Sequence, residues 1–60
     1  MVTVGMIIRS LTPNGEFFDF YKTRCSDFEP TDEELEESAR DGCQLIGTEF
    51  VSILSIDHCL

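Results

Sequence analysis

The sequence predicts an α+β fold in the order β-β-α-β, with a three-stranded antiparallel sheet and one acidic helix on one face. Three observations lead to this prediction. Two strand-like stretches flank a Pro-Asn-Gly turn, a capped and strongly acidic segment follows them, and a third strand-like stretch comes last. Residues 1–60 make a single domain, and a chain this short has a marginal core unless something else stabilises it.

Residues 1–24 are expected to form a β-hairpin. Residues 1–11 alternate between two sets of side chains with the period of a strand. A Thr-Pro-Asn-Gly segment at 12–15 supplies turn chemistry, because proline presets its φ and glycine accepts a positive φ. Residues 16–24 are rich in aromatic side chains, which favours a second strand. Its two faces carry Phe17, Asp19, Tyr21 and Thr23 on one side and Phe18, Phe20, Lys22 and Arg24 on the other.

The segment 27–41 holds eight acidic residues and one basic residue, so it carries −7 of the chain's net charge of −8. Thr31 is a good N-cap residue, and Glu34 completes a Thr-x-x-Glu capping box. Gly42 is expected to end the helix, because glycine readily adopts the left-handed conformation found there. At helical spacing the residues on the narrow apolar side are Leu35, Ala39 and Gly42. The opposite side is a broad anionic face.

Residues 48–56 are expected to form the third strand, and residues 57–60 a short tail. Strict alternation puts Phe50, Ser52, Leu54 and Ile56 on one face and Glu49, Val51, Ile53 and Ser55 on the other. The helical connection returns this strand parallel to the second strand. The first strand therefore lies in the middle of the sheet, antiparallel to both neighbours.

Composition disfavours several classes of function. The three cysteines, Cys25, Cys43 and Cys59, match no zinc pattern and are read as reduced, mostly buried residues. There is no secretory signal and no apolar run near 18 residues, so we expect a cytoplasmic protein without a membrane span. A lone histidine, His58, and scattered glycines give no catalytic or cofactor site, so we expect no enzyme and no cofactor. Direct nucleic-acid binding needs clustered Lys and Arg, which the chain lacks.

Apolar side chains are expected on both faces of the outer strands, yet a single helix covers only one face. In one interpretation Phe17 or Tyr21 merely shields a sheet edge. In the other, the uncovered face or a sheet edge is an interface, because contiguous exposed apolar patches usually mark one. We expect a homodimer, since self-association is a common supplement to stability at this length.

The anionic helix face also has two interpretations. Such a face is commonly just solvated and keeps a chain soluble. However, the pairs Glu33–Glu37 and Glu37–Asp41 place like charges at i,i+4, and the only favourable pair is Glu36–Arg40. This repulsion between carboxylates would be relieved by a basic partner surface, which the helix is therefore expected to bind. Proteins that handle nucleic acid have such surfaces, and rows of carboxylates can occupy the places of phosphates.

Four stretches resemble one known family. They are Thr3–Ile8, Gly15–Lys22, Ser26-Asp27-Phe28 and Thr48–Asp57. The chain resembles the small dimeric uracil-DNA glycosylase inhibitors of certain Bacillus phages, which are acidic and have the order β-β-α-β. The resemblance implies a dimer with an apolar pocket that captures the loop the enzyme inserts into the DNA minor groove, while acidic groups stand in for phosphates. It also implies Asp19 as the acid between aromatic residues and Phe28 as a pocket aromatic. Leu35 is the alternative, because the capping box starts the helix after Phe28.

The leading hypothesis is an acidic DNA-mimicking inhibitor that blocks a host DNA-binding enzyme in the host cytoplasm, with uracil-DNA glycosylase as the expected target. Its expected partner-binding residues are Asp19, Tyr21, Phe28, Glu33, Glu36 and Glu37. One alternative is another phage counter-defence inhibitor of the anti-CRISPR type. A third hypothesis, from a different class, is a structural or assembly accessory whose acidic helix only keeps it soluble.

Overall fold

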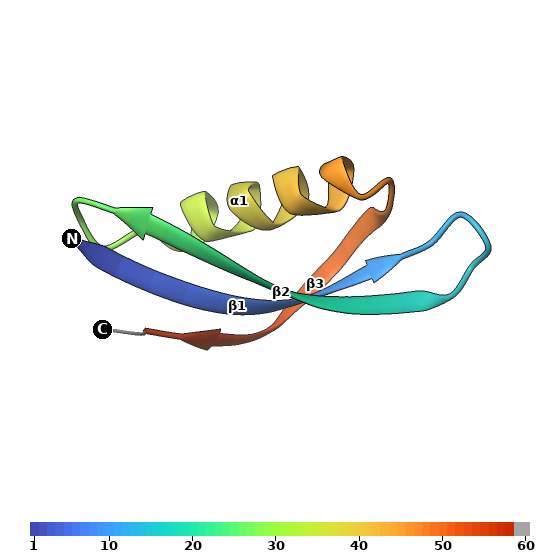
Figure 1. Ribbon diagram of the computed structural model, residues 1–60, viewed down its shortest axis with the longest axis horizontal. Coiled ribbons are helices and arrows are strands. Elements are labelled where there is room, and N and C mark those ends of the chain that lie inside the picture. The colour runs from blue at the N-terminus through green and yellow to red at the C-terminus, as the bar shows by residue number, and fades with distance from the viewer. Residues whose placement is uncertain (59–60) are drawn as a thin grey trace.

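The computed structural model describes residues 1–58. Its elements are β1 (Val2–Leu11), β2 (Phe17–Ser26), α1 (Asp32–Leu45) and β3 (Glu49–Asp57). The strands form one sheet in the order β2-β1-β3, and β1 is antiparallel to both neighbours. This confirms the predicted α+β fold and its central first strand. Figure 1 shows α1 lying along one face of the sheet, with no described element over the other face.

The hairpin pairs every residue of β1 with one of β2, from Val2 opposite Ser26 to Leu11 opposite Phe17. In the turn, Thr12 N donates to Glu16 O over 2.8 Å, and Gly15 adopts a φ of 83°. This positive φ is the reason for glycine at that position. β2 extends to Ser26 rather than ending at residue 24 as predicted, because its last residues still find partners in the first part of β1.

The core lies between α1 and one face of the sheet. From Val4 to Ser10 every second residue of β1 is fully buried there, and α1 adds a short apolar stripe. The buried residues are Val4, Met6, Ile8 and Ser10 from β1 with Leu35, Ala39 and Cys43 from α1. Ser10 is polar, and its hydroxyl donates to Phe18 O over 2.7 Å, which satisfies the buried group. A single layer of side chains thus joins helix and sheet.

The predicted start of α1 is confirmed and its predicted end is wrong. Thr31 Oγ1 accepts from Glu34 N over 3.2 Å, and Glu34 Oε1 accepts from Thr31 N over 2.9 Å, so both halves of the capping box form. The helix continues past Gly42 to residue 45, and Gly47, with a φ of 75°, supplies the left-handed stop.

Gly42 has a packing role instead. It is buried, and a Cβ at this position would lie 3.0 Å from Lys22 Cδ and 3.2 Å from Phe20 Cε2. The absence of a side chain therefore lets α1 approach β2 closely. Sequence spacing alone does not distinguish a glycine that ends a helix from one that another element packs against.

The predicted faces of β3 are partly wrong, because its pairing with β1 shifts register twice. Ile8 pairs with Ile53 and Ser10 pairs with Phe50, so Phe50 and Ile53 both pack against the core, whereas Leu54 is exposed. Each irregularity adds a residue to one strand and breaks the alternation on which the prediction rested.

The chain ends were also predicted only in part. Asp57 belongs to β3 rather than to a tail, and it lies opposite Gly5. Cys43 is buried as expected, but Cys25 is exposed at the end of β2, and both are free thiols. His58 follows β3 and is exposed, as expected of a tail residue, whereas Cys59 and Leu60 lie outside the described residues.

Candidate protein-binding surface

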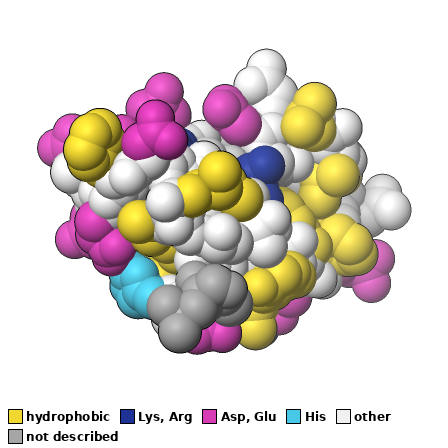
Figure 2. Space-filling model, turned by 60° about the vertical axis from the view of Figure 1, so that its left-hand side comes forward, with side chains coloured by type: hydrophobic (Ala, Val, Ile, Leu, Met, Phe, Trp, Pro, Cys, Tyr) yellow, Lys and Arg dark blue, Asp and Glu magenta, His cyan; other side chains and the backbone are white. Residues whose placement is uncertain are grey.

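The outer side of α1 is anionic. Its acidic residues are Asp32, Glu33, Glu34, Glu36, Glu37 and Asp41, all exposed, and its single basic residue is Arg40. Arg40 Nη2 lies 3.3 Å from Glu36 Oε2, which confirms the expected i,i+4 pair. Within residues 1–58, Glu33 and Glu37 have no ion pair. Figure 2 shows acidic side chains at the upper edge of the molecule and at other places around its rim, with apolar side chains between them.

Glu34 differs from the other helix carboxylates, because it holds the helix to the sheet. Arg24 Nη1 donates to Glu34 O over 3.2 Å, and Arg24 Nη2 lies 3.6 Å from Glu34 Oε2. The hydrogen bonds from Thr31, with a smaller contribution from Arg24, lower the pKa of Glu34. Glu34 is therefore a structural residue, and the free anionic surface consists of its neighbours.

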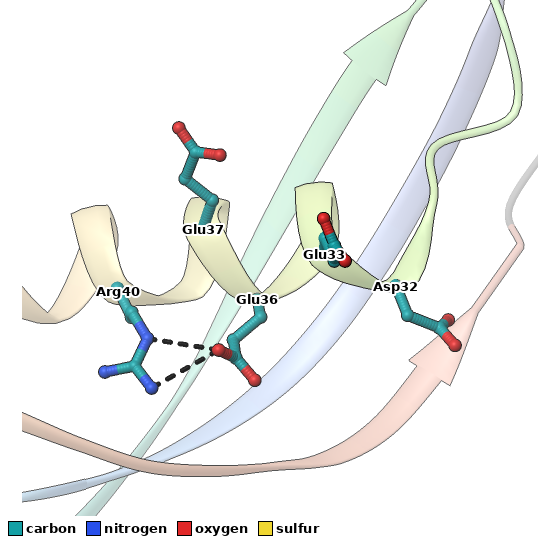
Figure 3. A pocket seen from close by; sticks show the side chains of 5 residues that line it. All are labelled: Asp32, Glu33, Glu36, Glu37 and Arg40. Carbon is teal, nitrogen blue, oxygen red and sulfur yellow. Dashed lines mark hydrogen bonds and ion pairs between the residues drawn. The ribbon is translucent and has the colours of Figure 1, made fainter.

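A shallow, open hollow lies on the helix surface. It is lined by Asp32, Glu33, Glu36, Glu37 and Arg40. In Figure 3, Glu36 and Arg40 point to the side of the helix that faces β3, whereas Glu37 points the opposite way. The carboxylates thus spread around the exposed side of the helix, so a partner must wrap around the helix or contact only part of them.

A second hollow, with a volume of about 450 Å³, runs between α1 and β3. Its apolar lining includes Leu35, Phe50, Ile53 and Ile56, and Asp32 and Glu36 also line it. The Arg40 guanidinium lies 4.8 Å from the centre of the Phe50 ring, which places a cation–π contact beside this groove. Carboxylates and an apolar groove therefore share one side of the molecule. We call this combined area the helix–β3 surface.

Asp19 and Tyr21 lie elsewhere. They pair with Arg9 and Ile7 of β1, on the face of the sheet opposite α1. Arg9 Nε and Nη2 each donate to a different carboxylate oxygen of Asp19 over 3.0 Å, and these hydrogen bonds lower the pKa of Asp19. The charge of Asp19 is therefore balanced within the sheet. The Tyr21 ring lies against Gly5, where a side chain on that glycine would collide with it.

Phe28 lies in the connection between β2 and α1, and 82% of its surface is exposed. The Ser26 hydroxyl donates to Phe28 O over 2.6 Å and fixes this turn of the backbone. Phe28 lines neither hollow, whereas Leu35, the alternative pocket residue, lines the groove. The structure thus groups Glu33, Glu36 and Glu37 on α1 and places the other expected residues apart from them.

The sequence prediction did not group the β3 residues of the groove, because it assumed that side chains alternate strictly between the two faces of a strand. Phe50, Ile53 and Ile56 recur every third residue, and only the two register shifts in β3 bring them to one side. The three-residue spacing is visible in the sequence. It is uninformative there, because an ordinary strand repeats every second residue.

Among residues 1–58 no three His, Cys, Asp or Glu side chains are grouped so as to hold a metal ion. The described helix is neither long enough nor apolar enough to cross a membrane.

The chain was compared with known proteins in three ways. No family model matches it, and no curated protein and no solved structure matches it either. The resemblance to the uracil-DNA glycosylase inhibitors therefore stays a prediction from the sequence.

Proposed function

We propose that this chain is an acidic DNA-mimicking inhibitor that binds a host DNA-binding enzyme and blocks its nucleic-acid groove. The observation that best supports this proposal is the set of exposed carboxylates on α1, Glu33, Glu36 and Glu37, of which Glu36 also lines the apolar groove, with one cation on the whole helix. Carboxylates held on a rigid helix match a surface shaped to bind phosphates. Uracil-DNA glycosylase is the target to test first, because the sequence resembles its inhibitors.

The negative charge of the molecule would speed association with the partner, and the apolar groove would hold the partner once it is bound. The net charge of −8 speeds the encounter with a basic surface and makes association sensitive to salt. The apolar groove between α1 and β3 then offers a desolvated anchor site for a partner side chain. Asp32 and Glu36 next to the groove favour an apolar side chain that has Lys or Arg nearby.

The same charges argue against other roles. Nucleic acid would be repelled by a chain with 12 acidic and four basic residues, so the partner is a protein rather than DNA or RNA. The helix carboxylates are exposed, whereas a catalytic acid or base works inside a site that holds the substrate against it, so we infer a non-enzymatic role. The proposed place of action is the cytoplasm of a host cell.

Two other functions remain as alternatives. A phage counter-defence inhibitor of the anti-CRISPR type would use the same helix–β3 surface against a different basic groove. A structural or assembly accessory would use the acidic helix only for solubility. Co-purification with host lysate distinguishes them, because the inhibitors retain a stoichiometric nucleic-acid enzyme and the accessory does not.

The test is a titration of the chain into a uracil-excision assay with bacterial uracil-DNA glycosylase. We expect stoichiometric inhibition that weakens as the salt concentration rises. The triple variant Glu33→Gln, Glu36→Gln and Glu37→Gln should inhibit more weakly and depend less on salt. Glu34 is left intact, because it caps α1 and binds Arg24.

The matched control removes the same number of charges away from α1, by Glu16→Gln, Asp27→Asn and Glu49→Gln. All three residues are exposed and lie outside the helix. Equal losses in the two triple variants would mean that only net charge matters, and would contradict the role of the helix. Absence of inhibition at large excess would exclude this target.

A further inference from the structure

The outer edge of β2 is a regular and unbroken stretch of backbone. β2 lies at one side of the sheet, and no described strand pairs with its outer edge. Its ten residues follow the register of β1 without a shift, and none of them is proline. Every residue from Phe17 to Ser26 therefore keeps a backbone N–H group that can donate to a neighbouring strand.

The outward backbone groups of β2 follow from its hydrogen bonds to β1. Phe18 O accepts from the Ser10 hydroxyl, and Glu16 O accepts from Thr12 N, so both carbonyl groups point towards β1. In an antiparallel pair, residues that bond to the neighbouring strand alternate with residues whose N–H and C=O groups point away from it. The residues with outward groups include Phe17, Asp19, Thr23 and Cys25. An added strand would find donors and acceptors there at the spacing of a sheet.

The other edge of the sheet is less suited to an added strand. The pairing of β3 with β1 shifts twice and leaves Val51 and Leu54 without a partner residue in β1. Bulges of this kind bend a strand and disfavour pairing at its outer edge. Glu49 and Asp57 add negative charge at the two ends of β3. β2 is therefore the better edge for strand addition.

Lys22 gives the β2 edge a preference for one charge. Each of the three arginines has a carboxylate partner in an ion pair, whereas Lys22 has none among residues 1–58. The stem of Lys22 lies against Gly42 of α1, which keeps it on the helix side of the sheet. A lysine at a sheet edge disfavours strands that bring no charge to match it. A carboxylate opposite Lys22 would remove this obstacle.

Two aromatic residues precede Lys22 on the same face of β2. The rings of Phe18 and Phe20 are stacked with their centroids 6.1 Å apart, and 47% of the surface of Phe18 is exposed. In Figure 1 the hairpin extends past the C-terminal end of α1, so the helix leaves its outer part uncovered. Apolar side chains of an added strand would pack against these rings, because adjacent strands bring side chains on one face into contact.

We propose that the outer edge of β2 binds an extended segment of a second protein by antiparallel strand addition. The segment carries an acidic residue opposite Lys22 and apolar residues opposite Phe20 and Phe18. Because it runs antiparallel to β2, it reads acidic-x-apolar-x-apolar, where x is an uncharged residue. A second copy of β2 does not fit, because the residues on the Lys22 face of this strand include no acid. The site lies at the opposite edge from β3, so it does not depend on the proposed inhibitor role.

The test uses a capped synthetic peptide, Thr-Glu-Thr-Val-Thr-Val-Thr, titrated into the isotope-labelled chain and followed by NMR. We expect the backbone amide signals of Asp19 and Thr23 to shift and their hydrogen exchange to slow. The signals of Val51 and Leu54, on the other edge strand, should stay unchanged.

Two modified peptides test the hydrogen bonds on the unmodified chain. In the proposed pairing the threonine N–H groups of the peptide point towards β2, and the valine N–H groups point away. N-methylation of the two central threonines should weaken binding by about tenfold or more, because several hydrogen bonds are lost. N-methylation of the two valines is the matched control and should leave these hydrogen bonds in place. Equal weakening by both modifications would contradict strand addition.

The charge preference is tested by exchanging the two charged groups. A peptide with lysine in place of its glutamate should bind the wild-type chain more weakly, and Lys22→Glu should reverse the order of the two peptides. The control, Asn14→Asp and Gln44→Glu, changes the net charge equally outside β2 and should keep the wild-type order. The same order of the peptides in Lys22→Glu and in the wild type would exclude Lys22 from the site.

Two further results overturn the proposal. One is the absence of shifts at Asp19 and Thr23 with the peptide at millimolar concentration. The other is a set of shifts at these two residues when the chain alone is concentrated, because a second copy would then occupy the edge.

Discussion

Arg9 and Asp19 face each other on β1 and β2, and two hydrogen bonds of 3.0 Å join the guanidinium to both carboxylate oxygens. Arg9 also lies 4.9 Å from the centre of the Phe17 ring. This bidentate pair fixes the long side chain of Arg9 against the sheet. It also removes Asp19 from the set of carboxylates that are free to imitate phosphate.

Stability should fall in acid. The hydrogen bonds from Arg9 lower the pKa of Asp19 below its ordinary value of 3.8, and those from Thr31 lower the pKa of Glu34 below 4.5. A depressed pKa in the folded state adds stability above the unfolded-state pKa, and this stability is lost as pH falls through the folded value. Urea unfolding from neutral to acidic pH measures this loss. Asp19→Asn should have a flatter pH profile than the wild type, and an unchanged profile would contradict the role of the pair.

Gly47→Ala should destabilise the fold, although nothing lies within 4 Å of the added methyl group. The cause is the φ of 75°, which an L-residue adopts only with strain of about 1 kcal/mol. The comparison is Gly42→Leu, where φ is ordinary but Phe20 and Lys22 leave little space. Overpacking there should cost about 1–3 kcal/mol. Urea unfolding measures both changes, and a neutral Gly47→Ala would show that the loop relaxes.

Ile7 and Ile8 provide a test of which face of β1 is buried. Ile8 is fully buried against α1, whereas Ile7 is 41% exposed on the sheet face opposite α1. Ile8→Val should reduce the free energy of unfolding by about 1 kcal/mol through the lost methylene. Ile7→Val should change the stability of the isolated chain by less than about 0.5 kcal/mol. Chemical denaturation compares the two variants, and equal losses would contradict the assigned faces.

Arg40→Gln should strengthen binding to a basic partner if the helix–β3 surface is the binding surface. The change removes the single cation of α1 and frees Glu36 from its 3.3 Å pair. The association rate should rise, most clearly at low salt, because the local field becomes more negative. Stopped-flow or biosensor kinetics with a captured target measure the rate. Lys22→Gln, which changes the charge equally on β2, is the control, and a matching increase there would indicate only a net-charge effect.

Local sequence chemistry determined a large part of this fold. Alternating apolar residues and a turn with a positive-φ glycine specify the hairpin, and the Thr31 and Glu34 capping box specifies where α1 begins. The charge of α1 was equally evident, because charge is a property of composition. These features depend on residues close together in the chain, so their patterns can be read before the fold is known.

Contacts between distant segments decided the remaining features. Gly42 lies within α1 rather than at its end, and Phe20 and Lys22 of β2 occupy the space that a side chain there would need. The groove on β3 exists because pairing with β1 shifts twice and brings Phe50 and Ile53 to the same side. The helix acids and Asp19 lie on opposite faces, because the sheet separates them. The strand register, the close packing of α1 on β2 and the face of the sheet on which a side chain lies all depend on residues far apart in the sequence. Only the tertiary structure could therefore define them.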